Sequence, residues 1–186
     1  VLDDAVKNIK QNHGIDVDLR RLPHTDEKTC RMLCDGGTGA VFQMESAGMT
    51  QLVRDLAPEN FADLIPLVAL YRPGPLGSGM VEDFIKGRHG EKEVTYMHPL
   101  LEPILKETFG VVLYQEQVML ISQKVAGFSK GKADKLRKAM GKKKIDILKS
   151  LYNDFIEGGK KNGHTEDVLK KTWKDWEKLA SYAYNK

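Results

Sequence analysis

The residues best suited to chemistry lie in one basic stretch, which runs from Ser129 to Lys149 and reads SKGKADKLRKAMGKKKIDILK. Residues 130–149 contain nine Lys or Arg and two Asp, so this window carries a net charge of +7 in a chain whose formal net charge is +3. The remainder of the chain is therefore net negative. Positive charge gathered in one place favours the binding of a polyanion, such as a nucleic acid or a polyphosphate.

The first part of this stretch is predicted to be a helix, with Ser129 as its N-cap and Gly141 just beyond its last turn. One face carries an apolar stripe at spacings of three and four, formed by Ala133, Leu136 and Met140. Arg137 lies on the edge of that stripe, where packing would hold its guanidinium. Three ammonium groups point away from the stripe: those of Lys135, Lys138 and Lys142. This combination suits a phosphate site, and a plain solvated basic surface is the alternative on composition alone.

Other residues that could bind metal ions or form disulfides do not make a complete motif. Asp16 and Asp18 form an Asp-x-Asp pair, which can bind divalent metal ions for phosphoryl transfer, but no apolar strand holds these two carboxylates rigidly. Cys30 and Cys34 are the only cysteines, too few for a disulfide framework or a complete zinc site. We therefore expect reduced thiols in a cytoplasmic protein.

The composition indicates a globular protein of one or two domains. The 186 residues are 41% hydrophobic and 30% charged. No apolar run approaches the roughly 18 residues that a membrane span requires, and no signal peptide is recognisable, so no membrane association is expected. The chain begins at Val1 inside an amphipathic pattern and ends at Lys186 after a helical run. We interpret it as a piece of a longer polypeptide.

Helical periodicity covers most of the chain and predicts about eight to ten helices, with almost none of the alternation typical of strands. The predicted fold class is mainly α, with little or no sheet. Ser46 is expected to cap one helix. The helix after the basic stretch is expected to end at Gly158 and Gly159, and the last helix to bury Trp173 and Trp176.

Prolines interrupt the apolar sequence of residues 60–79. A helix is predicted to begin at Asn60, with a kink at Pro66 and an inward face formed by Phe61, Leu64, Ile65 and Val68. The segment YRPGPLGSG (71–79) is predicted to be a stiff loop that presents Arg72, either as an anion ligand or as an exposed loop residue. Residues 87–93 are predicted to be a polar loop.

Five stretches, in this order and spacing, are more specific than any single motif. They read GAVFQMESAGM (39–49), FADLIPLVALYRPGPL (61–76), GVVLYQEQVM (110–119), ADKLRKAMGKKK (133–144) and WEKLASYAYNK (176–186). Together they resemble the alpha (catalytic) subunit of bacterial replicative DNA polymerase III, a C-family DNA polymerase, over essentially the whole chain. Pro66 departs from that family, which usually has a small or apolar residue there.

The resemblance implies a position within that polymerase. Residues 1–186 would be the first part of its multi-helix fingers domain, with a possible sub-boundary near residues 88–98, and the palm, thumb and C-terminal domains would lie outside the chain. Three palm aspartates of the family hold two Mg²⁺ ions, so the resemblance places the Mg²⁺ ligands and the catalytic residues outside this chain. The fragment alone is expected to be catalytically inactive.

The resemblance also implies contacts to substrate. The family's paired basic residues on the triphosphate of the incoming dNTP correspond to Arg137 and Lys138, with Lys replacing the commoner second Arg. Tyr182 corresponds to a tyrosine that lies against the nascent base pair. Arg72 corresponds to the arginine of the family's RPGPL motif and would contact the triphosphate or lie near the template. Asn185 and Lys186 are further dNTP contacts that the resemblance implies. Contacts to the DNA backbone are assigned to Lys142, Lys143 and Lys144.

The implied activity is template-directed DNA synthesis on primer–template DNA. Further implied partners are the sliding clamp, the clamp loader and the proofreading exonuclease, reached through other parts of the full-length protein. Two alternatives remain open. One is a non-catalytic helical module that binds the phosphate backbone of nucleic acids, and the other is a helical interaction domain whose basic helix binds an acidic protein.

Overall fold

The computed structural model describes residues 1–142 and 144–179, and these residues are mostly helical. They form eleven α-helices and four short 3-10 helices, with no β-strand in the described part of the chain, so the predicted mainly α fold is confirmed. The α-helices are α1 (Leu2–His13), α2 (Glu27–Cys34), α3 (Ala47–Leu56), α4 (Leu64–Leu70), α5 (Pro73–Gly77), α6 (Met80–Arg88), α7 (Glu102–Leu105), α8 (Gln115–Ala126), α9 (Lys130–Gly141), α10 (Ile145–Lys161) and α11 (Glu166–Leu179). The 3-10 helices are η1 (Leu19–Arg21), η2 (Phe61–Asp63), η3 (Pro99–Leu101) and η4 (Lys106–Thr108).

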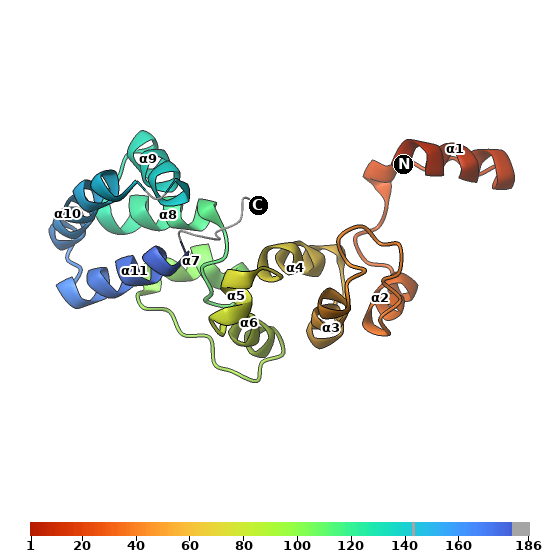
Figure 1. Cartoon of the computed structure of the whole chain (residues 1–186), viewed down its shortest axis with the longest axis horizontal. Helices are drawn as coiled ribbons and strands as arrows, with labels where there is room; N and C mark the ends of the chain where they lie inside the picture. Colours follow the sequence, from red (N-terminus) through yellow and green to blue (C-terminus); the bar gives the residue numbers. More distant parts are fainter. Residues whose placement is uncertain (143, 180–186) are drawn as a thin grey trace.

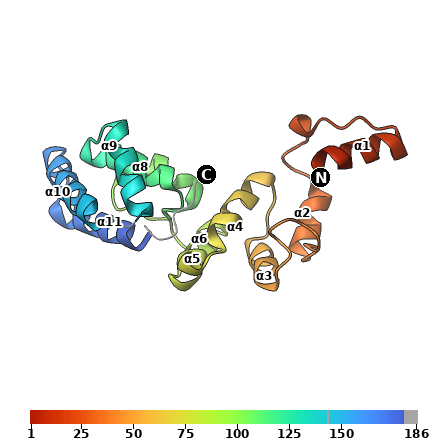
Figure 2. The same cartoon turned by 45° about the horizontal axis from the view of Figure 1, so that its top comes forward.

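The helices are arranged along one long axis. Figures 1 and 2 show the chain running from α1 at one end, through α2 to α6, to the group α7 to α11 at the other end. Helix α1 has an amphipathic sequence but contributes no buried residue. Apart from the short helix α5, the remaining helices bury their apolar faces in two separate clusters.

Each cluster is the apolar core of one part of the molecule. The first joins helices α2, α3, α4 and α6, and its most buried members include Val53, Leu67 and Leu70. The second joins η3 and helices α7 to α11, and its most buried members include Ala133, Leu136, Phe155 and Leu169. Trp173 and Trp176 belong to this second core and are 4% and 1% exposed, which confirms the predicted burial of both indoles.

The segment around Pro66 differs from the prediction. A helical segment begins after Asn60 as predicted, with Asn60 and Asp63 forming a capping box, but the segment is the 3-10 helix η2 rather than an α-helix. Helix α4 begins only at Leu64, so Pro66 lies in its first turn, where a missing N–H leaves no helical hydrogen bond unmade. The tighter 3-10 turn also changes which face is inward. Phe61 is 59% exposed, Leu64 is partly buried against the first core as predicted, and the fully buried residues are Pro66, Leu67, Ala69 and Leu70.

The segment after α4 is more helical than predicted. Pro73 occupies the first position of the short helix α5, where its fixed φ suits helix initiation, so part of the predicted loop is one helical turn. Arg72 is the N-cap of α5, with φ −145° and ψ 152°, an extended conformation that the following proline favours.

Helix α10 does not end at Gly158 and Gly159 as predicted, but continues to Lys161. The two glycines lie where neighbouring elements approach the helix closely. A Cβ on Gly158 would collide with the backbone carbonyl of Ala126, and a Cβ on Gly159 would collide with the side chain of Leu169. These glycines therefore serve the packing of α10 against α8 and α11.

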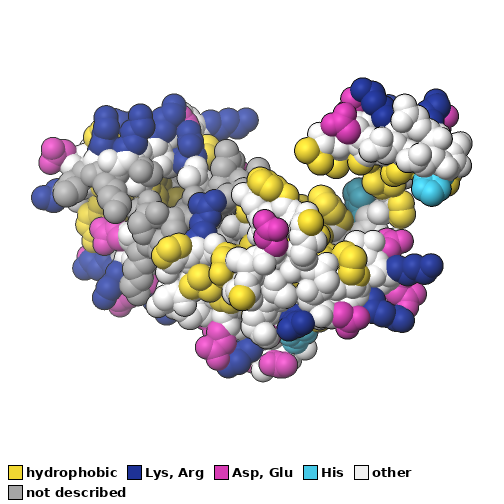
Figure 3. All heavy atoms as spheres, turned by 45° about the vertical axis from the view of Figure 1, so that its right-hand side comes forward, with side chains coloured by type: hydrophobic (Ala, Val, Ile, Leu, Met, Phe, Trp, Pro, Cys, Tyr) yellow, Lys and Arg dark blue, Asp and Glu magenta, His cyan; other side chains and the backbone are white. Residues whose placement is uncertain are grey.

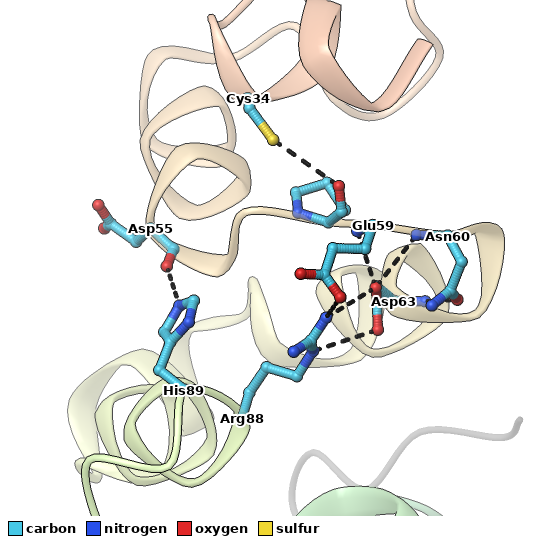
Figure 4. A network of polar contacts seen from close by, with 8 residues as sticks. Cys34, Asp55, Glu59, Asn60, Asp63, Arg88 and His89 are labelled. Atoms are coloured by element: carbon cyan, nitrogen blue, oxygen red, sulfur yellow. Dashed lines mark hydrogen bonds and ion pairs between the residues drawn. The ribbon is translucent and has the colours of Figure 1, made fainter. Parts of the chain in front are cut away.

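Arg88, predicted to lie in a polar loop, is the last residue of α6 and connects distant segments (Figure 4). Its guanidinium donates to Glu59 Oε2 at 2.9 Å and to Asp63 Oδ2 at 3.3 Å. Asp63 Oδ2 also accepts from the backbone N–H groups of Glu59 and Asn60, at 2.9 and 3.2 Å. Burial raises the pKa of Asp63, but these N–H groups and Arg88 lower it more, and the pKa lies below its usual value.

Candidate functional site

Helix α9 is the element that positions the predicted phosphate-binding residues. Its N-cap is Ser129 as predicted, with Oγ accepting from the backbone N–H of Lys132 at 3.3 Å. The predicted apolar stripe is buried and also includes Ala139; its members are Ala133, Leu136, Ala139 and Met140. Gly141 proves to be the last helical residue and Lys142 the C-cap, one residue later than predicted. Because the stripe packs against α8 and α10, the opposite face of α9 stays in solvent.

Arg137 lies at the edge of the stripe, as predicted, and its side chain is 32% exposed. Its Nε and Nη2 donate to Asp134 Oδ1 at 3.0 and 2.8 Å. Its Nη1 donates to Gln115 Oε1 at 3.3 Å, across to the first residue of α8. The guanidinium is thus held by a charged partner on its own helix, Asp134, and a neutral partner on α8, Gln115.

Lys138 shares the same charged partner. Its Nζ lies 2.7 Å from Asp134 Oδ2, while its side chain stays 62% exposed. One carboxylate therefore bridges two neighbouring cations, one with each oxygen. The ion pairs with Lys138 and then Arg137 hold the pKa of Asp134 below its usual value, so Asp134 is ionised at neutral pH.

A basic hollow lies next to Arg137 and is partly lined by Asp134 and Lys138. It has a volume of about 340 Å³ and is lined by Gly131, Asp134, Lys135, Lys138, Ala139, Lys142, Lys144 and Ile147. In the described residues, Lys138 is the only one of its four lysines that forms an ion pair. Figure 3 shows Lys and Arg side chains gathered over the end of the molecule that carries α9. We call this feature the basic hollow below.

The structure brings together some of the predicted site residues. Arg137 and Lys138 meet at Asp134, and Lys138 shares the basic hollow with Lys142 and Lys144. Arg72 lies on a different element, the start of α5, which Figures 1 and 2 both place apart from α9. Four predicted residues lie outside the described part of the chain: Lys143, Tyr182, Asn185 and Lys186.

Asp134 and Gln115 belong to the site but were not predicted from the sequence. Asp134 precedes Arg137 by three positions and Lys138 by four, which is the spacing of ion pairs on a helix, so its role was accessible from sequence. Gln115 is 22 residues from Arg137 in the chain, and only the packing of α8 against α9 brings them together.

Two further features bear on the classes of function that the fold could support. Across residues 1–142 and 144–179, no three His, Cys, Asp or Glu side chains are grouped as metal ligands would be. In the same residues, no helix combines the length and the apolar composition that crossing a bilayer requires.

Comparison with known proteins identifies close relatives. Residues 1–163 match the family described as the bacterial DNA polymerase III alpha subunit finger domain. The chain is 49% identical over 178 residues to the DNA polymerase III subunit alpha of Aquifex aeolicus, 45% identical over 186 residues to that of Helicobacter pylori, and 43% identical over 186 residues to that of Halalkalibacterium halodurans. These alignments cover 96% to 100% of this chain but only 15% to 16% of each relative.

Proposed function

The chain belongs to the bacterial DNA polymerase III alpha subunit finger-domain family, and from this premise we propose that it forms part of the fingers of a replicative DNA-directed DNA polymerase. In this role it would bind the triphosphate of the incoming dNTP and the backbone of primer–template DNA. The single observation that carries the proposal is the basic end of α9, where Arg137 and Lys138 lie side by side next to the basic hollow.

The proposed chemical task is to place positive charge at the triphosphate. Phosphoryl transfer requires little covalent chemistry from the protein, so positioning and charge stabilisation account for most of the catalysis. Arg137 is held by Asp134 and Gln115, which suits an ordered contact to phosphate oxygens. Lys138 is more exposed and would act as a mobile point charge.

The remaining lysines suit a different part of the substrate. Lys142 and Lys144 line the basic hollow, and Lys143 lies between them in sequence. Lysines around an open hollow can neutralise phosphates without reading base edges, as a polymerase that copies any template requires. We assign these three lysines to the DNA backbone.

The rest of the assignment follows from family membership. Arg72, Tyr182, Asn185 and Lys186 are proposed nucleotide contacts. Mg²⁺ would be held by aspartates of the palm, outside this chain, so the chain alone would be inactive. The same proposal includes a sub-boundary near residues 88–98. It also includes the clamp, the clamp loader and the exonuclease as further partners of the full-length protein.

The experiment is steady-state kinetics on a DNA polymerase III alpha subunit that contains this chain. Replacing Arg137 by Ala should raise the KM for dNTP by about tenfold or more, because a charge-assisted contact to phosphate is lost. Arg31→Ala is the matched control, since Arg31 is exposed on α2 and, among the described residues, forms an ion pair only with Glu27 of the same helix. A KM for dNTP that stays normal in Arg137→Ala would overturn the triphosphate assignment.

The second candidate function is a non-catalytic module that binds nucleic-acid backbones. It is favoured by the three lysines of the basic hollow without ion pairs in the described residues: Lys135, Lys142 and Lys144. It predicts that the 186-residue chain by itself binds duplex DNA, with an affinity that falls steeply as salt rises. Fluorescence anisotropy at low salt tests this, and an absence of binding there would exclude it.

A further inference from the structure

At the end of α9, two cations share a single carboxylate. Arg137 and Lys138 provide two positive charges, and Asp134 provides the single carboxylate that both contact. Each carboxylate oxygen has one cation, with Oδ1 at 2.8 Å from Arg137 Nη2 and Oδ2 at 2.7 Å from Lys138 Nζ. A phosphate placed between the same two cations would present its oxygens in the same manner.

We propose that Asp134 is a built-in competitor of the triphosphate, a carboxylate that occupies Arg137 and Lys138 when no nucleotide is bound and leaves them when phosphate arrives. This inference rests on the proposed function, because it assumes that phosphate reaches these two cations. It assigns to Asp134 a role in tuning affinity and product release, without contact to the reacting atoms.

The geometry allows the exchange to occur without rearranging the fold. Asp134 lies on the same helix as both cations and its side chain is 35% exposed, so rotation about its side-chain bonds would move the carboxylate into water. Arg137 would keep its contact to Gln115, a neutral acceptor on α8. The guanidinium would therefore stay in place while its charged partner changes.

The charge balance favours the exchange in the presence of a polyphosphate. The basic hollow adds Lys135, Lys142 and Lys144, so the surroundings of Asp134 keep an excess of positive charge. A triphosphate carries several negative charges and satisfies more of these cations than one carboxylate can. After the reaction, the return of Asp134 would displace pyrophosphate and shorten its stay on the enzyme.

A purely structural role for Asp134 predicts the opposite effect. If the carboxylate only held Arg137 and Lys138 in position for the nucleotide, its removal would disorder both cations and weaken phosphate binding. If it competes with phosphate, its removal would strengthen phosphate binding. The sign of the change in affinity therefore distinguishes the two roles.

The test uses Asp134→Asn in the complete alpha subunit, with two measurements: the KM for dNTP and the inhibition constant of inorganic pyrophosphate. Loss of the competitor should lower both constants by roughly two- to fivefold, as expected for removing a partly exposed ion pair. The matched control is Asp154→Asn, because Asp154 pairs with another α9 residue, Lys132, at 2.7 Å but does not line the basic hollow. Both constants should be unchanged in the control.

The outcomes separate this inference from the proposed function. Unchanged or raised constants in Asp134→Asn, together with a raised KM in Arg137→Ala, would overturn the competitor role and leave the triphosphate assignment standing. A normal KM in Arg137→Ala would overturn the assignment itself. Asp134→Ala provides a second variant, in which the same direction of change is expected if competition with phosphate is the cause.

Discussion

Two arginines of similar burial have opposite charge surroundings in this molecule. The side chain of Arg88 is 19% exposed and contacts two carboxylates, those of Glu59 and Asp63. The side chain of Arg137 is 32% exposed and shares one carboxylate with Lys138. The first cluster has more carboxylates than cations, and the second has more cations than carboxylates.

The difference indicates which cluster can bind an anion. Arg88 is 25 and 29 residues from its two partners, so its ion pairs connect α6 to the start of α4 (Figure 4). An added phosphate would meet a surplus of negative charge there. The ion pairs of Arg137 and Lys138 lie within one turn of α9 and connect no distant segments. Burial of an arginine is therefore a weaker guide to function than the ratio of opposite charges around it.

The largest expected effect is on stability, from Arg88→Ala. The substitution removes the contacts between α6 and η2 and leaves Asp63, 15% exposed, without its cationic partner. We expect a loss of about 2–3 kcal/mol in the free energy of unfolding, because an unpaired, partly buried carboxylate is unfavourable. Urea unfolding of the 186-residue chain measures it. A loss below about 0.5 kcal/mol would show that the cluster does not hold the two segments together.

The next effect is on activity, from Lys138→Glu in the complete alpha subunit. Reversing this charge places a second carboxylate beside Arg137 and gives the α9 cluster the surplus of negative charge seen around Arg88. We expect the KM for dNTP to rise by about tenfold or more, with unfolding of the chain little changed. A normal KM would break the proposed link between charge ratio and anion binding.

A smaller effect is expected in acid. The pKa of folded Asp63 is below its usual value, so its stabilising contribution is present at neutral pH and is lost as the pH falls through that lowered pKa. The chain should become less stable in acid, and Asp63→Asn should show less of this dependence. Thermal unfolding at a series of pH values measures it. An unaltered pH dependence in Asp63→Asn would mean that other carboxylates account for the acid sensitivity.

The smallest effect is expected for Glu27→Gln, which removes an ion pair between two exposed side chains of α2, Glu27 and Arg31. Such pairs contribute little in water, so the free energy of unfolding should change by less than about 0.5 kcal/mol. Urea unfolding beside Arg88→Ala gives the contrast directly. A comparable loss in both variants would remove the distinction between local and connecting ion pairs.

The sequence predicted well what depends on neighbouring residues. Ser46 and Ser129 cap α3 and α9 as expected, because a cap requires only a hydroxyl and the N–H three residues later. The burial of Trp173 and Trp176 also followed from spacing. The sequence further identified the family, through motifs in a fixed order, and comparison with known proteins confirmed it.

Predictions failed where distant segments meet. Arg88 could not be recognised as a connecting residue, because its partners Glu59 and Asp63 lie in another part of the chain. Gly158 lies inside α10 rather than at the predicted helix end, and the close approach of the Ala126 carbonyl leaves no room there for a side chain. The predicted burial of Phe61 is wrong, because a 3-10 turn precedes α4 and shifts the start of the helix to Leu64.

The helical class, the caps at Ser46 and Ser129, the family and the concentration of charge on α9 could all be predicted from the sequence, because each depends on a local pattern. The contact of Arg137 with Gln115 and the gathering of four lysines around one hollow could not be predicted, because they depend on how the helices pack. The physical reason is that ion pairs and hollows depend on distances between side chains, and packing sets those distances when α8, α9 and α10 bury their apolar faces against one another.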